Sequence, residues 1–217
     1  MNRLYNMDCM EGMAQFPDKY FDLAIVDPPY GIQTEHAFVG AGKLKNRTLN
    51  INGKDVGKWD VAPSSKYFAE LFRTSKNSII WGGNYFNLPP TRCFVVWDKA
   101  QPFENFSACE FAWTSFNYPS KVYKEQVTLS VPSRDRIHPT QKSVKLYQWL
   151  LAKFARPGDK IIDTHAGSAA SLVACHGAKY DYVGFEINSD YYNAALERLE
   201  KAKAQLDLFN DNGGGDA

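Results

Sequence analysis

The sequence predicts a doubly wound α/β fold, in which a mostly parallel, Rossmann-like sheet carries helices on both faces. The first observation is the segment "FDLAIV" (21–26), whose hydrophobicity is continuous and not alternating apart from Asp22, which suits a strand buried on both faces. The second is the last third of the chain, residues 160–202, where strand and helix patterns alternate as they do in a βαβ unit.

Size and composition favour one globular domain. A chain of 217 residues and 24.5 kDa has room for one core, and 44% hydrophobic with 23% charged residues argues against disorder. No apolar run approaches the roughly 18 residues of a membrane span, and the N-terminus lacks a signal-peptide pattern. We therefore expect one domain over residues 1–206, a frayed tail at 207–217, no membrane association and a cytoplasmic location in a bacterial or phage-type system.

The cysteines, the histidines and the net charge exclude few further classes of function. The four cysteines form no CxxC pair and the four histidines show no i, i+4 spacing, so we expect reduced thiols and no metal site. The net charge of +1 leaves nucleic-acid binding open, because clustering matters more than the total. Positive charge gathers in residues 43–58, inside an expected mobile loop of about 31–62, where phosphate contact and plain solvation are both possible.

The elements expected before residue 160 follow from the same apolar patterns. A short apolar run predicts a weak strand near residue 4, and helical spacing between stop signals predicts two helices. Two neighbouring apolar runs should pair and supply an antiparallel edge strand. The full set is a strand at 21–26, a helix at about 64–76, a strand at 78–83, strands at 92–99 and 109–116, an irregular segment at 117–137 and a helix at 144–154.

The last third contains a candidate nucleotide site. Ligands of doubly wound sheets lie at the carboxyl ends of the strands, where a turn of small residues such as "DTHAGSAAS" (163–171) lets the backbone approach them. The turn lacks the three glycines of a dinucleotide site, which argues against NAD. Glu186 closes the next strand and could accept hydrogen bonds from both ribose hydroxyls. A helix-capping role for Glu186, and a turn-capping role for Asp163, stay open.

A second candidate site follows the buried strand, in "LAIVDPPYGI" (23–32). Pro28 and Pro29 fix φ and donate no hydrogen bonds, so the loop offers acceptors only, the Asp27 carboxylate and the Pro28 carbonyl. These two acceptors could bind both hydrogens of a planar exocyclic amine and localise its lone pair for attack. Tyr30 could stack on the base that carries the amine. An ordinary turn is the alternative interpretation.

Taken together, these segments resemble the S-adenosylmethionine-dependent DNA amino-methyltransferases in their circularly permuted β-class arrangement. "NMDCMEGM" (6–13) resembles the opening segment of that family, "DPPY" (27–30) matches its catalytic loop, and "RIHPTQKSVKLYQWLL" (136–151) is similar to its "HPTQKP" segment. "DTHAGSAAS" and "GFEIN" (184–188) resemble its cofactor turn and ribose acid. The permuted order would let the strand near residue 4 complete the nucleotide half of the sheet.

The resemblance implies a role for each matching residue, with S-adenosylmethionine as cofactor. The catalytic residues would be Asp27, Pro28, Pro29 and Tyr30. Asp8 and Cys9 would lie against the adenine of the cofactor, Thr140 and Lys142 at its methionine end, and Glu186 and Ile187 at its ribose. The cofactor turn would comprise Asp163, Thr164, His165, Ala166, Gly167 and Ser168.

The chain departs from the family pattern at four positions. The cofactor turn of the family commonly reads DPFxGSG, whereas this chain has Thr164, His165 and Ala169 in place of Pro, Phe and the second Gly. Ser143 replaces a proline of the family. Ala169 suits a tight turn if its φ is negative. These changes bear on cofactor affinity and not on the type of reaction.

The implied function is methyl transfer from S-adenosylmethionine to the N6 amine of adenine, in a DNA base flipped out of the duplex, as in restriction-modification systems. An aspartate before the prolines favours adenine in this family, but cytosine N4 offers the same amine geometry. A protein-glutamine methyltransferase and a catalytically silent nucleic-acid-binding module are further alternatives. The lack of a cysteine beside the prolines disfavours carbon-5 methylation.

DNA would be contacted by the loop at 31–62 and by a recognition segment at 117–137. The segment carries two lysines and two arginines, Lys121, Lys124, Arg134 and Arg136. So small a surface predicts a short or relaxed target site. A monomer and a homodimer both stay open.

Overall fold

The computed structural model describes residues 1–32, 60–101, 107–126, 137–138 and 140–211, with side chains to residue 205. Most of the predicted mobile loop (31–62) and residues 127–136 of the predicted recognition segment, with Arg134 and Arg136, lie outside the described residues.

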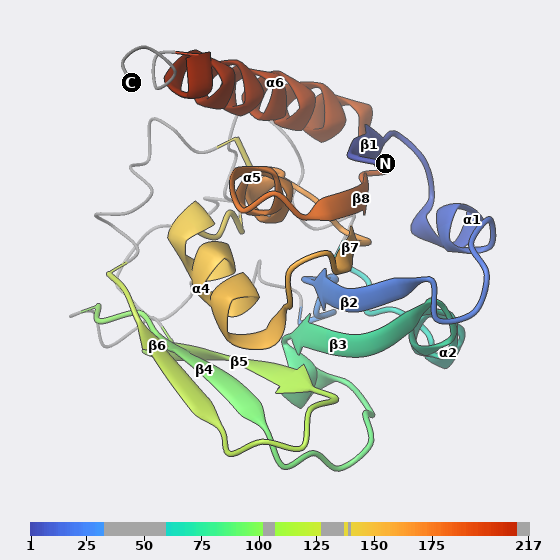
Figure 1. Cartoon of the computed structure of the whole chain (residues 1–217). Helices are drawn as coiled ribbons and strands as arrows, with labels where there is room; N and C mark the ends of the chain where they lie inside the picture. Colours follow the sequence, from blue (N-terminus) through green and yellow to red (C-terminus); the bar gives the residue numbers. More distant parts are fainter. Residues whose placement is uncertain (33–59, 102–106, 127–136, 139, 212–217) are drawn as a thin grey trace, which may run out of the picture.

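One eight-stranded sheet forms the centre of the molecule, in the order β1-β8-β7-β2-β3-β5-β4-β6 (Figure 1). Neighbouring strands are parallel except at β5, which runs antiparallel to β3 and β4. The strands are β1 Arg3–Tyr5, β2 Phe21–Val26, β3 Ser75–Trp81, β4 Phe94–Asp98, β5 Cys109–Thr114, β6 Lys121–Lys124, β7 Lys160–Asp163 and β8 Asp181–Phe185.

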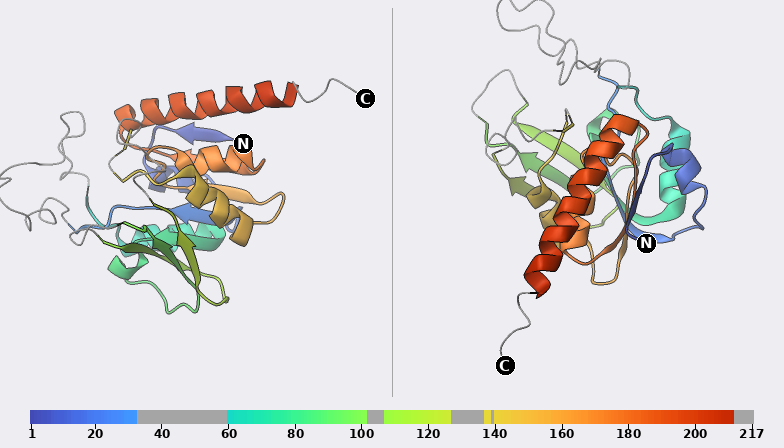
Figure 2. Two further views of the ribbon diagram at one scale, coloured as in Figure 1. Left: turned by 90° about the vertical axis from the view of Figure 1, so that its left-hand side faces the viewer. Right: turned by 90° about the horizontal axis from the view of Figure 1, so that it is seen from above.

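Helices cover both faces of the sheet, which confirms the doubly wound class. Figure 2 shows α1 and α2 on one side of the sheet and α4, α5 and α6 on the other. The helices are α1 Cys9–Met13, α2 Ser65–Thr74, the 3₁₀ turn η2 Gly83–Tyr85, α4 Val144–Phe154, α5 Ala170–Gly177 and α6 Ser189–Asp211. None of the helices in the described part of the chain is long and apolar enough to cross a membrane.

The packing of strand β2 explains why four apolar residues, 23–26, follow one another in its sequence. Leu23 and Ile25 point into a core shared with α4 and α5, whereas Phe21 and Val26 point into a second core shared with α2. Both faces of the strand are therefore covered, as the pattern predicts. This double burial fixes β2 as a rigid support for the loop that follows it.

The N-terminal strand closes the permuted sheet. β1 pairs in parallel with β8, with Arg3 opposite Val183 and Tyr5 opposite Phe185. The Glu186 amide also donates to the Tyr5 carbonyl at 3.0 Å. The first residues of the chain thus complete the half of the sheet built by the last third, as the permuted motif order predicts.

The antiparallel strand does not lie where the sequence analysis put it. We expected it at the edge, but β4 and β6 both lie outside β5. The edge strand β6 falls in segment 117–137, which we expected to be irregular. Its KVYK sequence alternates, and lysines are common on edge strands, where they discourage pairing with another chain.

Two helix boundaries and two short elements also differ from expectation. The helix expected to reach residue 76 ends at Thr74, where its hydroxyl donates to the Glu70 carbonyl at 3.0 Å and Ser75 begins β3. The helix α6 runs to Asp211, past the expected start of the frayed tail at 207. Helix α1 and turn η2 were not predicted, because elements of five and three residues are too short to show a period.

Candidate active site

Four strands deliver acidic residues to one edge of the sheet. The carboxyl ends of parallel strands meet at a common edge. Asp27 follows β2 there, Asp163 ends β7, Glu186 follows β8, and Asp8 lies just beyond β1. A cavity of about 570 Å³ opens at this edge.

The cavity collects almost every residue that the sequence analysis singled out. The lining includes Asp27, Pro28, Pro29, Tyr30, Asp8, Cys9, Thr140, Lys142, Thr164, His165, Ala166, Gly167, Ser168, Glu186 and Ile187. Asp163 is the exception, since it is buried behind the turn. Residues distant in sequence therefore meet at one cavity.

The Asp27 carboxylate has two protein partners. Its Oδ1 accepts a hydrogen bond from the Tyr30 hydroxyl at 2.7 Å, and its Oδ2 lies 2.5 Å from the Lys142 Nζ. Burial disfavours the charged form of Lys142, but Asp27 and Glu110 outweigh that effect and raise its pKa. The buried acid is thus neutralised by an ammonium group 115 residues away in the sequence.

The Tyr30 ring is held on several sides. Tyr85 stacks on it with centroids 5.1 Å apart, and Phe86 meets it edge-on at 6.2 Å. Gly82, at φ +68°, lies so close that a Cβ there would be 2.2 Å from Tyr30 Cε1. Burial and the neighbouring Asp27 raise the pKa of Tyr30 well above its usual value, so the phenol stays neutral and donates to Asp27.

The small-residue turn is organised by its own polar groups. Asp163 accepts hydrogen bonds from the His165 amide at 3.0 Å and from the Ser171 hydroxyl. The Thr164 hydroxyl lies 2.6 Å from the Tyr67 hydroxyl and 2.9 Å from His165 Nδ1. Burial lowers the pKa of His165 to about 4, so its imidazole is neutral at pH 7.

Ala169 does not have the negative φ that would have suited it. Its φ is +56°, at the N-cap of α5, so this alanine occupies the left-handed region that normally favours glycine. Gly167 has φ +52° two residues earlier. The turn therefore keeps the backbone shape of a glycine-rich turn although one glycine is replaced.

Glu186 joins the small-residue turn to the segment that follows β8 through main-chain amides. Its Oε2 accepts from the Gly167 amide at 3.0 Å and its Oε1 from the Asn188 amide at 2.8 Å. Burial raises the pKa of this carboxyl. Each oxygen keeps a further lone pair for a ligand, which fits the hydroxyl pair of a ribose. Asp8, across the cavity, caps α1 by accepting from the Met10 amide at 2.7 Å.

Sequence reasoning missed several residues of the site. Glu110 contacts Lys142 at 3.2 Å and Lys99 at 2.5 Å, and Trp81 places its ring 5.1 Å from the Lys142 ammonium. The signal for Glu110 was present, because an acid interrupts the otherwise apolar strand "CEFAWT". Tyr85 had no comparable signal, since its contact with Tyr30 depends on the fold.

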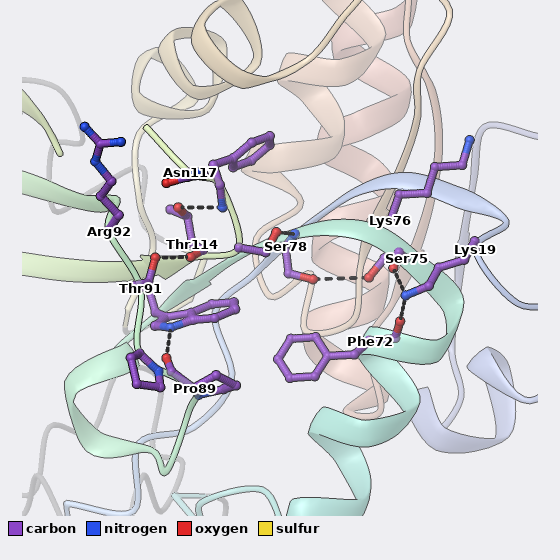
Figure 3. Close-up of a pocket in the computed structure, with 14 residues that line it drawn as sticks. Lys19, Phe72, Ser75, Lys76, Ser78, Pro89, Thr91, Arg92, Thr114 and Asn117 are labelled. Atoms are coloured by element: carbon purple, nitrogen blue, oxygen red, sulfur yellow. Dashed lines mark hydrogen bonds between the residues drawn. The ribbon is translucent and has the colours of Figure 1, made fainter. Parts of the chain in front are cut away.

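A second cavity, of about 490 Å³, lies near the amino ends of β3 and β4 (Figure 3). Its polar groups bond mainly to one another: Lys19 donates to the Ser75 carbonyl at 3.1 Å, and Trp113 donates to the Pro89 carbonyl at 2.7 Å. We assign it no ligand. In the described part of the chain, no group of three or more His, Cys, Asp or Glu side chains could hold a metal ion.

Comparisons with known proteins agree with the motifs. Residues 96–197 match the sequence profile of a family described as DNA methylase. The Type II methyltransferase M.HinfI of Haemophilus influenzae is 26% identical over 261 residues, covering 94% of this chain and 69% of its own. These matches confirm the family resemblance drawn from the sequence.

Solved structures share the fold. M1.HpyAVI, crystallised as a complex with SAM, aligns with a TM-score of 0.58 at 18% identity, over 90% of this chain and 98% of its own. The PvuII DNA methyltransferase, described as cytosine-N4-specific, aligns with a TM-score of 0.56 at 13% identity, over 93% and 91%. The Rossmann-like α/β fold is thereby confirmed.

The packing of Tyr30 on Gly82 predicts a matched pair of glycine substitutions. Gly82→Ala and Gly158→Ala both place a side chain at positive φ, but a Cβ at Gly158 meets nothing within 4 Å. We expect Gly158→Ala to lower the free energy of unfolding by about 1 kcal/mol, and Gly82→Ala by about 1–3 kcal/mol more. Urea unfolding measures both, and equal losses would show that the Tyr30 ring yields without cost.

The buried carboxyl of Asp163 predicts a pH-dependent stability difference. Burial raises its pKa from 3.8 to about 7, so between about pH 4 and pH 7 the folded state keeps a proton that the unfolded state loses. This carboxyl therefore contributes less stability as pH rises through that window. Relative to the unaltered chain, Asp163→Asn should gain a few kcal/mol at most from pH 4 to pH 7, and nothing further above it. A constant difference in unfolding free energy across that range would contradict the assignment.

Proposed function

We propose that this chain, an S-adenosylmethionine-dependent DNA methyltransferase of the N6/N4 family, methylates the N6 amine of adenine in a flipped-out base. The observation that carries the proposal is the meeting of two parts at one cavity. The Asp27–Tyr30 loop, which offers acceptors for an amine, and Glu186, which offers acceptors for a ribose, both line it. An amine and a nucleoside cofactor could therefore be bound side by side.

The acceptor loop accounts for the chemistry. Asp27 and the Pro28 carbonyl accept hydrogen bonds from the two amine hydrogens, which localises the nitrogen lone pair. Tyr30, its ring fixed by Tyr85 and Gly82, supplies the stacking face for the base. When bound, S-adenosylmethionine would supply a methyl group on a positively charged sulfur. The S–CH3 bond would break as the N–CH3 bond forms, the sulfur would leave as a neutral thioether, and the methylated amine would release one proton to solvent. No protein nucleophile is needed, and the rate comes largely from positioning two bound reactants.

The cofactor side is proposed to use the residues opposite that loop. Glu186 accepts from the ribose hydroxyls, with Ile187 beside it, and Asp8 and Cys9 flank the adenine. The turn from Asp163 to Ser168 approaches the rest of the nucleoside. Asp163 is buried behind this turn, so it would act without touching the cofactor. Thr140 and Lys142 are assigned to the methionine end.

Cytosine N4 is the second candidate target. It presents the same planar amine, and the similarity to PvuII methyltransferase, which is cytosine-N4-specific, supports it. Asp27 before the prolines favours adenine. We therefore keep adenine as the proposed base.

DNA is the proposed macromolecular substrate, and residues 1–206 are proposed to form one methyltransferase domain. The loop at 31–62 and the segment at 117–137 are the parts assigned to DNA contact. Lys121 and Lys124 on β6 belong to that segment. The Lys124 side chain is 71% exposed and lies 3.5 Å from Asp98, an exposed ion pair that a phosphate could replace.

The first test removes the amine acceptor. We expect Asp27→Ala to abolish transfer of labelled methyl groups to mixed-sequence DNA while leaving the Kd for S-adenosylmethionine within about threefold, because Asp27 itself is assigned to the amine and not to the cofactor. Lys142 keeps Glu110 as a partner in this variant, so the protein should fold, which a thermal melt checks. Unchanged turnover would contradict the mechanism.

The second test identifies the methylated base. DNA methylated by the purified protein is digested to nucleosides and separated by mass spectrometry. We expect N6-methyladenine, because the loop begins with aspartate. N4-methylcytosine would establish the second candidate, and unmethylated DNA would favour a silent binding module.

Sequencing of DNA from an expressing host should show a short or relaxed target site.

A further inference from the structure

Four charged side chains of alternating sign form a chain beside the cavity. Asp27 contacts Lys142 at 2.5 Å, Lys142 contacts Glu110 at 3.2 Å, and Glu110 contacts Lys99 at 2.5 Å. The Lys142 side chain is only 4% exposed and lies against the Trp81 ring. We call this set of four residues the charge chain.

The charge chain places Lys142 in competition with the amine of the substrate. Both oxygens of Asp27 already accept hydrogen bonds, one from Tyr30 and one from Lys142. An amine that binds Asp27 must share this carboxylate with the ammonium. An ammonium without a second carboxylate would be drawn fully to Asp27, because buried charges attract each other strongly.

Glu110 is the second carboxylate that Lys142 needs. It enters from β5, on the side of Lys142 away from β2, and Lys99 holds its other oxygen. Burial disfavours its charged form, but Lys142 and Lys99 outweigh burial and lower its pKa to about 2. Glu110 is therefore ionised at every pH at which the enzyme would be assayed.

We propose that Glu110 is a positioning residue for methyl transfer, which acts by sharing the Lys142 ammonium so that Asp27 can accept the amine. This inference rests on the proposed function, since it concerns the same carboxylate. It does not depend on whether the amine belongs to adenine or to cytosine. Glu110 itself does not line the cavity, so it acts through Lys142 and not by touching the substrate.

A double-mutant cycle tests the inference. Glu110→Gln removes the charge at nearly constant shape, and we expect it to lower kcat about tenfold or more while the Kd for S-adenosylmethionine changes less than about threefold. In a Lys142→Met background, the same change should not lower kcat further. Glu110→Asp, which restores the carboxylate, should recover most of the activity.

A matched control separates this effect from a general loss of negative charge. Glu197 pairs with Lys201 on the exposed surface of α6, and its side chain is 68% exposed. Glu197→Gln should leave kcat and Kd unchanged. Thermal melts of all variants show whether each is folded. If Lys142→Met has no measurable turnover, the kcat values of Glu110→Gln and Glu110→Asp alone decide whether the carboxylate of Glu110 is needed.

Any one of three results would overturn the inference alone. They are an unchanged kcat in Glu110→Gln, an equal loss of kcat with and without Lys142, and no recovery of kcat in Glu110→Asp. Each is compared with an unaltered chain that methylates DNA. An unaltered chain that methylates no DNA would overturn the proposed function and, with it, this inference.

Discussion

The ion pair between Asp27 and Lys142 is the contact on which the arrangement of the active site depends. It ties the end of β2 to the segment that leads into α4, two parts of the chain that share no strand pairing. A buried ion pair is weak support for stability, because removing two charges from water offsets most of their attraction. Its effect here is geometric: it fixes where the carboxylate points, and the Tyr30 hydroxyl bonds to that same carboxylate.

The sheet makes this contact possible. Parallel strands bring the ends of β1, β2, β7 and β8 to one edge, so that the Asp27–Tyr30 loop from early in the sequence shares a cavity with the turn at 164–168 from late in it. The antiparallel strand β5 begins at this same edge and runs away from it, so its first residues carry Glu110 to Lys142. One reversed strand inside the sheet thus adds a side chain that a purely parallel sheet would have placed at the opposite edge.

Much of this architecture could be predicted from local patterns, and the exceptions have physical reasons. The boundaries of β2 follow from a segment in which every residue but Asp22 is apolar, and Asp27, Tyr30 and Glu186 follow from their place after strands. The partners of Asp27 could not be predicted, because Lys142 reaches it only through the tertiary fold. The positive φ of Ala169 was also hidden, since its residue type argues for the opposite. The edge strand β6 was missed because its neighbours in space, and not its composition, make it a strand.

The pairing of β1 with β8 has a consequence for synthesis of the protein. β1 leaves the ribosome well before β8, so Asn6 must wait for Glu186, 180 residues later, before their hydrogen bond at 2.8 Å can form. Contacts so distant in sequence form slowly. The nascent chain can assemble the β2–β3 half of the sheet early, but the cavity gains its Glu186 wall only once β8 has been translated. A chain stalled before β8 would thus carry the Asp27–Tyr30 loop without the wall that faces it.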